Sequence, residues 1–85
     1  MRRVDFYSQS SCGPCKMIKP VLNELVEAKE IEANYITLEE HGRDAFIEKG
    51  VRSTPTLIFY KDGEEVERFS GFLPKEQFLE KYNNA

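Results

Sequence analysis

Apolar residues recur along the chain with two spacings, which predict alternating strands and helices. A helical spacing is shared by Met17, Ile18, Val21, Leu22, Leu25 and Val26. We therefore expect a first helix over residues 13–29, bent at Pro20 because proline removes one backbone hydrogen bond. Strand-like runs at residues 3–7 and 34–38 flank this helix. Because a helix joins the two strands, we expect them to be parallel.

The second half of the chain predicts two further helices. A short helix is expected over residues 42–49, with Phe46 and Ile47 facing inward. Pro74 suits the start of a final helix, since its fixed φ fits a first helical turn. The inner face of that helix is expected to hold Phe78, Leu79 and Tyr82. The polar residues 83–85 are expected to fray at its end.

Between these helices the sequence indicates a hairpin. Strands over residues 56–60 and 66–70 flank Asp62-Gly63, a dipeptide that favours a tight turn between antiparallel strands. The complete order is βαβαββα. We therefore predict an α/β fold in which a four-stranded mixed sheet is flanked by three helices, with residues 1–85 forming a single domain.

The charge distribution and the lack of a long apolar stretch argue against two classes of protein, those that bind nucleic acid and those that associate with membranes. The net charge is −3 and the acidic and basic residues are interspersed, so the chain has no basic stripe for nucleic acid and we expect no nucleic-acid partner. No apolar stretch of signal-peptide or membrane-span length follows the first residues. We therefore expect no membrane association, and a cytoplasmic location is the default.

The two cysteines of the chain stand in Cys12-Gly13-Pro14-Cys15, between the first strand and the first helix. Backbone N–H groups and the positive end of a helix dipole stabilise an anion at a helix start, so a Cys12 thiolate should form more easily than the model thiol pKa of roughly 8.5 allows. Cys15, one turn into the helix, is close enough to form a disulfide and suits the resolving role. Gly13 leaves the backbone open to a partner, and Pro14 fits the first turn.

Two structural interpretations of the pair are less favourable. A structural metal site needs about four ligands, and besides the two sulfurs the chain offers one histidine, His41, so we expect no metal. A disulfide across two residues closes too short a loop to stabilise the fold much. In a reducing compartment a vicinal cysteine pair is more often catalytic than structural.

The chain resembles the thioredoxin family in three separated segments. They are Val4-Asp5-Phe6 followed by Cys12-Gly13-Pro14-Cys15-Lys16-Met17-Ile18-Lys19-Pro20, then Thr54-Pro55-Thr56-Leu57, and finally Lys61-Asp62-Gly63-Glu64 with Ser70-Gly71-Phe72-Leu73. Together these segments span most of the chain, and the resemblance implies a thioredoxin-like fold. The chain is shorter than a typical thioredoxin.

The resemblance also implies where a substrate would bind. Thr54-Pro55 should be a cis peptide bond facing the cysteines, and the backbone of Thr54 should pair with an extended substrate segment. From the residues alone, an ordinary trans proline at a strand start would be the better interpretation. Gly71 should keep the surface clear for the partner. Phe72 either fills the core or enlarges an apolar docking patch.

Two departures from the family pattern concern the surroundings of the cysteines. Ser11 stands where thioredoxins usually have tryptophan, and the chain has no tryptophan. Asp5 resembles the buried acid that accepts a proton from the second cysteine, and we assign it that catalytic role as an expectation, with an exposed acid of the strand as the alternative. Counting back from Cys12 without a gap instead places Phe6 at that position, and the two registers send Asp5 to opposite faces of the sheet. Tyr35 falls near the place of the accompanying lysine.

The resemblance implies a thiol–disulfide oxidoreductase that reduces protein disulfides and needs no bound cofactor. Gly-Pro between the cysteines resembles the reducing members, so we expect a potential nearer to about −270 mV than to about −120 mV. An NADPH-dependent thioredoxin reductase would supply electrons to a monomer, and acceptors could include a ribonucleotide reductase or a peroxidase. The alternatives are a glutaredoxin-like enzyme recharged by glutathione and a non-catalytic binding module.

Overall fold

The computed structural model of the protein describes residues 1–84, and its elements follow the predicted order βαβαββα. The strands are β1 (Arg2–Ser8), β2 (Ala33–Thr37), β3 (Thr56–Lys61) and β4 (Glu64–Ser70). The helices are α1 (Gly13–Glu27), α2 (Leu38–Glu48) and α3 (Lys75–Asn84). The predicted number and sequence of elements are therefore confirmed.

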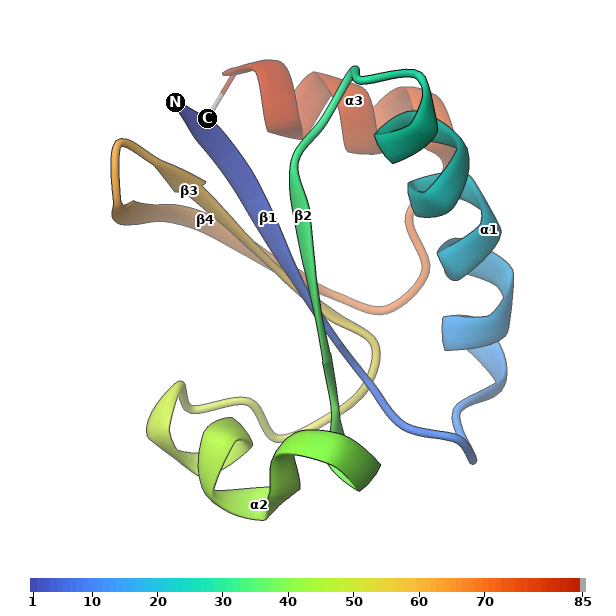
Figure 1. The fold of residues 1–85 in the computed structure, drawn as a ribbon, viewed down its shortest axis with the longest axis vertical. Coiled ribbons are helices and arrows are strands. Elements are labelled where there is room, and N and C mark those ends of the chain that lie inside the picture. Colours follow the sequence, from blue (N-terminus) through green and yellow to red (C-terminus); the bar gives the residue numbers. More distant parts are fainter. Residues whose placement is uncertain (85) are drawn as a thin grey trace.

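The four strands form one mixed sheet in the order β2-β1-β3-β4 (Figure 1). β1 is parallel to β2 and antiparallel to β3, and β3 is antiparallel to β4. Asp62 and Gly63 form the turn between β3 and β4 with φ values of 53° and 87°. Left-handed backbone of this kind suits these two residue types, which confirms the predicted hairpin turn.

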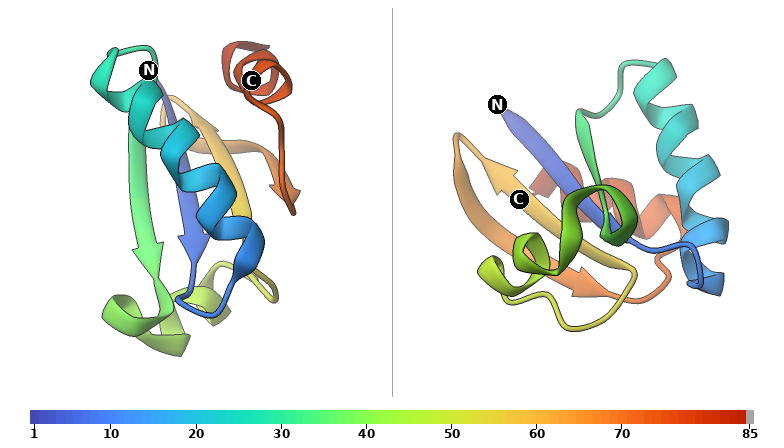
Figure 2. Two further views of the ribbon diagram at one scale, coloured as in Figure 1. Left: turned by 90° about the vertical axis from the view of Figure 1, so that its right-hand side faces the viewer. Right: turned by 60° about the horizontal axis from the view of Figure 1, so that its bottom comes forward.

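Successive side chains of β1 point to opposite faces of the sheet, and each face carries its own hydrophobic cluster. Val4 and Phe6 point to one face, where they join a cluster with buried residues of α1 and α3. Tyr7 points to the other face and packs against Phe46 of α2, with the two rings perpendicular at 5.2 Å. Figure 1 shows α1 and α3 beside one another, and the right-hand view of Figure 2 brings α2 forward, in front of the strands. The sheet is thus covered by helices on both faces.

Helix α2 differs from its prediction at its start. It begins at Leu38 rather than at Gly42, because Thr37 caps it: the Thr37 side chain accepts from the N–H of Glu40 at 3.2 Å and lies 3.3 Å from the Glu40 carboxylate. Thr37 is therefore a side-chain N-cap, while its own N–H donates to Nδ1 of His41. Gly42 interrupts the helix with a φ of 78°. The position of Gly42 is therefore a kink inside the helix rather than its beginning.

The inward face predicted for α2 is half correct. Phe46 is 7% exposed, but Ile47 is 68% exposed, so the prediction that Ile47 faces inward is wrong. Neighbouring residues on a helix point about 100° apart, and the packing against Tyr7 selects Phe46. Of the polar tail predicted at residues 83–85, Asn83 and Asn84 belong to α3, and Ala85 lies outside the described residues.

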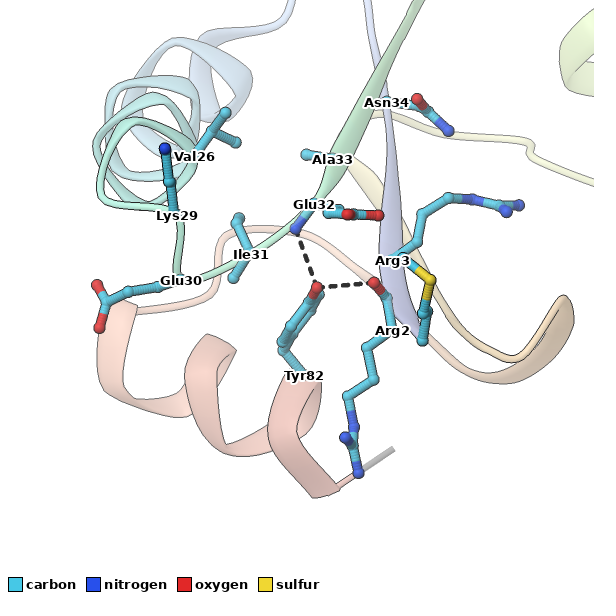
Figure 3. A pocket seen from close by; sticks show the side chains of 11 residues that line it. Arg2, Arg3, Val26, Lys29, Glu30, Ile31, Glu32, Ala33, Asn34 and Tyr82 are labelled. Atoms are coloured by element: carbon cyan, nitrogen blue, oxygen red, sulfur yellow. Dashed lines mark hydrogen bonds between the residues drawn. The ribbon is translucent and has the colours of Figure 1, made fainter.

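Tyr82 of α3 ties the last helix to the beginnings of two strands (Figure 3). Its hydroxyl donates to the carbonyl of Arg2 at 2.9 Å and accepts from the N–H of Glu32 at 2.9 Å. This contact lies at the end of β1 opposite to the cysteines. None of the helices within residues 1–84 combines the length and the apolar character needed to cross a membrane.

Candidate active site

The two cysteines lie where β1 gives way to α1 and are joined by a disulfide. Cys12 is the N-cap of α1, with extended backbone at φ −87° and ψ 108°. Its N–H donates to the carbonyl of Gln9 at 3.1 Å, and its sulfur accepts from the N–H of Cys15 at 3.1 Å. Cys12 therefore occupies the helix N-terminus that the sequence predicted, with a backbone donor aimed at its sulfur.

Both cysteines are largely covered in this oxidised state, whereas the two residues between them are exposed. Cys12 is 6% exposed and Cys15 is 4% exposed, while Gly13 and Pro14 lie at the surface. A Cβ placed on Gly13 would meet nothing within 4 Å, so no contact inside the chain requires glycine there. The surface at Gly13 is therefore open, beside a disulfide that is itself largely covered.

The loop before β3 carries the second part of the site. The Thr54-Pro55 peptide bond is cis, as the family resemblance implied. The carbonyl of Pro55 accepts from the N–H of Gly71 at 2.9 Å, so this loop is fixed to the end of β4. Gly71 has a φ of 109°, a conformation that favours glycine. Phe72 follows and is 41% exposed, so its ring lies at the surface instead of filling the core.

Two side-chain contacts hold the loop before Cys12, and the sequence did not identify either. Gln9 donates from Nε2 to Oγ1 of Thr54 at 3.1 Å, which links the cysteine loop to the cis-proline loop. Ser10 donates from its N–H and its Oγ to one carboxylate oxygen of Glu39, at 3.1 and 3.0 Å. The bond from the Ser10 backbone is the main cause that lowers the pKa of Glu39. Because β1 and β2 are parallel, their carboxyl ends share an edge of the sheet, and that topology was the available signal.

Asp5 does not lie beneath the cysteines. Its carboxylate accepts from Nε of Arg3 at 3.0 Å and from Nδ2 of Asn34 at 3.1 Å. It points to the face that carries Tyr7, whereas the cysteines cluster with Phe6 on the opposite face. The expectation that Asp5 accepts a proton from Cys15 is therefore wrong in its geometry. Phe6, which the ungapped count from Cys12 selects, instead lies on the face of the cysteines and lines a cavity together with Cys15.

An aromatic pair stands where the resemblance implied an acid and a lysine. Phe6 is paired with Tyr35 across β1 and β2, and the two rings meet edge to face at 6.0 Å. Phe6 and Cys15 line a cavity of about 450 Å³ whose outer wall includes Lys16 and Glu39. The cavity beside Cys15 is therefore lined by charged and polar side chains together with the buried ring of Phe6.

His41 and the acidic residues do not form a metal site. The His41 Nδ1 atom accepts from the N–H of Thr37 at 3.3 Å, at the start of α2. In the part of the chain from residue 1 to 84, no three side chains of His, Cys, Asp or Glu are grouped so that they could hold a metal ion.

Comparisons with known proteins agree on one family. The family model described as Thioredoxin matches residues 3–84. A thioredoxin of Staphylococcus saprophyticus is 46% identical over 78 residues, which is 91% of this chain and 74% of that protein. A thioredoxin of Staphylococcus aureus is 45% identical over the same shares of the two chains.

Solved structures show the same likeness in three dimensions. A mutant thioredoxin from Halobacterium salinarum superposes with a TM-score of 0.88 at 28% identity, over 98% of this chain and 73% of that one. The thioredoxin of Fasciola hepatica gives a TM-score of 0.81 at 31% identity, over 98% of this chain and 79% of that one.

Proposed function

The chain belongs to the thioredoxin family, and from that membership we propose a division of roles within its thiol–disulfide oxidoreductase chemistry. Cys12 attacks the disulfide of a partner protein, and Cys15 resolves the intermediate. The observation that carries this assignment is the position of Cys12 as the N-cap of α1, where its sulfur accepts from the N–H of Cys15. A thiolate is stabilised at that position by the helix dipole and the backbone donor.

The reaction transfers two electrons and two protons from the protein to its substrate. The Cys12 thiolate forms a bond to one substrate sulfur, the substrate disulfide breaks, and the other substrate sulfur leaves as a thiolate. Cys15 then attacks Cys12, forms the Cys12–Cys15 disulfide and releases the second substrate thiolate. The proton of Cys15 and the proton originally held by Cys12 finish on the two substrate thiols. The structure corresponds to the oxidised product of this sequence.

Substrate binding rests on the rigid surroundings of the disulfide. An extended substrate segment would pair with the backbone of Thr54, in the manner of an added strand. The hydrogen bond from Gly71 to Pro55 and the contact of Gln9 with Thr54 support this role, because they hold that backbone in one conformation. Gly13 and Pro14 leave the approach open, and the exposed ring of Phe72 beside Gly71 adds apolar surface.

Thioredoxins act on disulfide substrates and are reduced by thioredoxin reductase. For this chain we propose an NADPH-dependent flavoprotein reductase as the electron donor and a monomer in the cytoplasm as the working form. A ribonucleotide reductase or a peroxidase would be a suitable acceptor. The mechanism needs no bound cofactor, since both electrons are carried by the two sulfurs.

The donor can be identified with the oxidised protein. Thiol release would be followed with NADPH and thioredoxin reductase, and separately with NADPH, glutathione and glutathione reductase. We expect rapid release with the first system and slow release with the second. Rapid release with glutathione alone would contradict the proposal and assign the chain to a glutaredoxin-like function.

A further inference from the structure

A second cavity, of about 350 Å³, adjoins the cis-proline loop and is not lined by Cys15. It lies between α2 and the segment that leads into β3. We call it the arginine groove and define it by Leu38, Arg43, Phe46, Ile47, Val51 and Arg52. Gln9, Ser53 and Thr54 complete its lining. Because Gln9 and Thr54 also join the cysteine loop to the cis-proline loop, the arginine groove is continuous with the proposed substrate contact.

The floor of the arginine groove is apolar and firmly held. Phe46 and Val51 are each 7% exposed, and the N–H of Val51 donates to the carbonyl of Phe46 at 2.8 Å. Ile47 stands at the rim and is 68% exposed. Its side chain adds apolar surface to a concave site without contributing to the buried core. An apolar side chain of a partner protein would therefore contact Phe46 and Val51 at the bottom of the groove and Ile47 at its rim.

The charge of the arginine groove is opposite to that of the whole chain. Arg43 and Arg52 are both exposed, and neither takes part in the ion pairs found within residues 1–84. No acidic side chain of the described residues contributes to its lining, whereas Glu39 and Glu40 line the cavity beside Cys15. The chain as a whole carries a net charge of −3. Two guanidinium groups free to pair with carboxylates thus mark one side of the substrate contact.

We propose that the arginine groove is a specificity subsite that selects disulfide-bearing protein segments with an apolar side chain next to acidic residues. The inference rests on the proposed pairing of substrate with Thr54. A segment extended along that backbone advances about 3.3 Å per residue, so one or two residues beyond the disulfide reach the groove that Thr54 itself lines. There the apolar side chain contacts Phe46 and Ile47, and the carboxylates pair with Arg43 and Arg52.

Two synthetic peptides test this selectivity. Both carry the same disulfide, flanked on each side by Glu-Leu-Glu in one peptide and by Gln-Leu-Gln in its twin. The fully reduced protein is mixed with each peptide, quenched with acid, and the second-order rate constant of its oxidation is measured by mass spectrometry. We expect the acidic peptide to react about fivefold faster, since each exposed charge pair contributes modestly. Raising the salt concentration should reduce this preference.

A charge-matched pair of variants assigns the preference to the arginine groove. Arg43→Gln combined with Arg52→Gln should bring the ratio of the two rate constants to about one. Lys29→Gln combined with Lys61→Gln removes the same charge at the opposite end of β1 and should leave the ratio near five. Ile47→Ala should slow both peptides by about fivefold, because both carry the leucine.

The possible outcomes distinguish a failure of the proposed subsite from a failure of the proposed reductase function. If the protein reduces both peptides at equal rates, or if the two double variants have equal effects, the subsite is disproved while the reductase function stands. If the reduced protein reacts with neither peptide, both the proposed function and the subsite fail. A faster rate with the acidic peptide that only the arginine variant abolishes supports the proposal.

Discussion

Cys12 is held in place by backbone contacts at its N–H and at its sulfur. Its N–H donates to Gln9, and its sulfur accepts from Cys15. Both partners are main-chain groups fixed by the junction of β1 with α1. The main chain thus orients the attacking sulfur, and the aromatic pair of Phe6 and Tyr35 lies in β1 and β2.

Tyr7 should make the stability of the protein depend on alkaline pH. Burial, with a smaller contribution from the negative charge of Asp5, raises the pKa of Tyr7 from 10.0 to about 12. The folded state thus holds the phenol proton more tightly than the unfolded chain does. The resulting stabilisation is complete below pH 10 and is lost as the pH rises toward about 12.

Urea unfolding across this alkaline range measures the effect. Tyr7→Phe removes the titrating group, so its free energy of unfolding should fall less steeply with pH than that of the unsubstituted protein. Comparing the two proteins cancels the lysines and other tyrosines that titrate in the same range. Parallel curves for the two proteins would show that Tyr7 ionises as freely in the folded state as in the unfolded chain.

Cys12 and Asp5 differ in how well the sequence predicts their positions in the structure. The site of Cys12 was predictable, because a strand pattern precedes it and a helix pattern follows it. The orientation of Asp5 was not, because the sequence admits two registers that differ by one residue, and strand alternation sends Asp5 to opposite faces in the two registers. The partners that resolve the question, Arg3 and Asn34, become visible only when the strands are paired.

At the scale of elements, two adjacent residues of α2 have different roles, one in the core and one at the surface. Phe46 packs edge to face on Tyr7, whereas Ile47 is exposed at the rim of the arginine groove. Phe46→Ala should lower the free energy of unfolding by about 3 kcal/mol, through lost burial and the cavity left behind. Ile47→Ala should change it by no more than about 0.5 kcal/mol.

Thermal or urea unfolding of the two variants measures this difference directly. Both substitutions remove a large apolar side chain from the same helix, so the intrinsic preference of alanine for helices affects both. Equal losses of stability would mean that Ile47 is buried in solution, which would contradict the position of α2 and remove the rim of the arginine groove.

Boundaries of elements were harder to predict than their order. The order followed from alternating apolar spacings and the Asp62-Gly63 turn. The start of α2 was misplaced because residues 34–38 were assigned to a strand, which concealed the capping signal of Thr37 followed by Glu40. A helix cap and a strand end compete for the same residues, and only the tertiary arrangement decides between them.

On the scale of the whole molecule, the two ends of β1 serve different purposes. The carboxyl ends of β1 and β2 carry the disulfide, Glu39 and the loops around them, while α3 closes the opposite end through Tyr82 (Figure 3). The individual side-chain contacts between these distant segments were beyond prediction from the sequence, although the expected parallel pairing of the first two strands brings their carboxyl ends to one edge of the sheet. Gln9 with Thr54, Ser10 with Glu39, and Tyr82 with Arg2 each join residues far apart in the chain, with no local pattern to mark them.

Tyr82→Phe should destabilise the fold and leave the disulfide chemistry intact. The substitution keeps the buried ring but removes the partner of the Arg2 carbonyl and of the Glu32 N–H. We expect a loss of about 1–2 kcal/mol in the free energy of unfolding, because two backbone groups lose their hydrogen bond. Reaction of the reduced protein with a disulfide peptide under folding conditions should keep its rate. A slower reaction at full stability would contradict this separation of the two ends.

The most direct test of the assigned cysteine roles is trapping of the mixed disulfide. Cys15→Ser and Cys12→Ser would each be incubated with a disulfide-bearing protein substrate, and the products separated without reductant and weighed by mass spectrometry. We predict that Cys15→Ser accumulates a covalent adduct through Cys12, because no second thiol remains to release it, and that Cys12→Ser accumulates little. Adduct formation that is equal in the two variants, or faster through Cys15, would contradict Cys12 as the attacking residue.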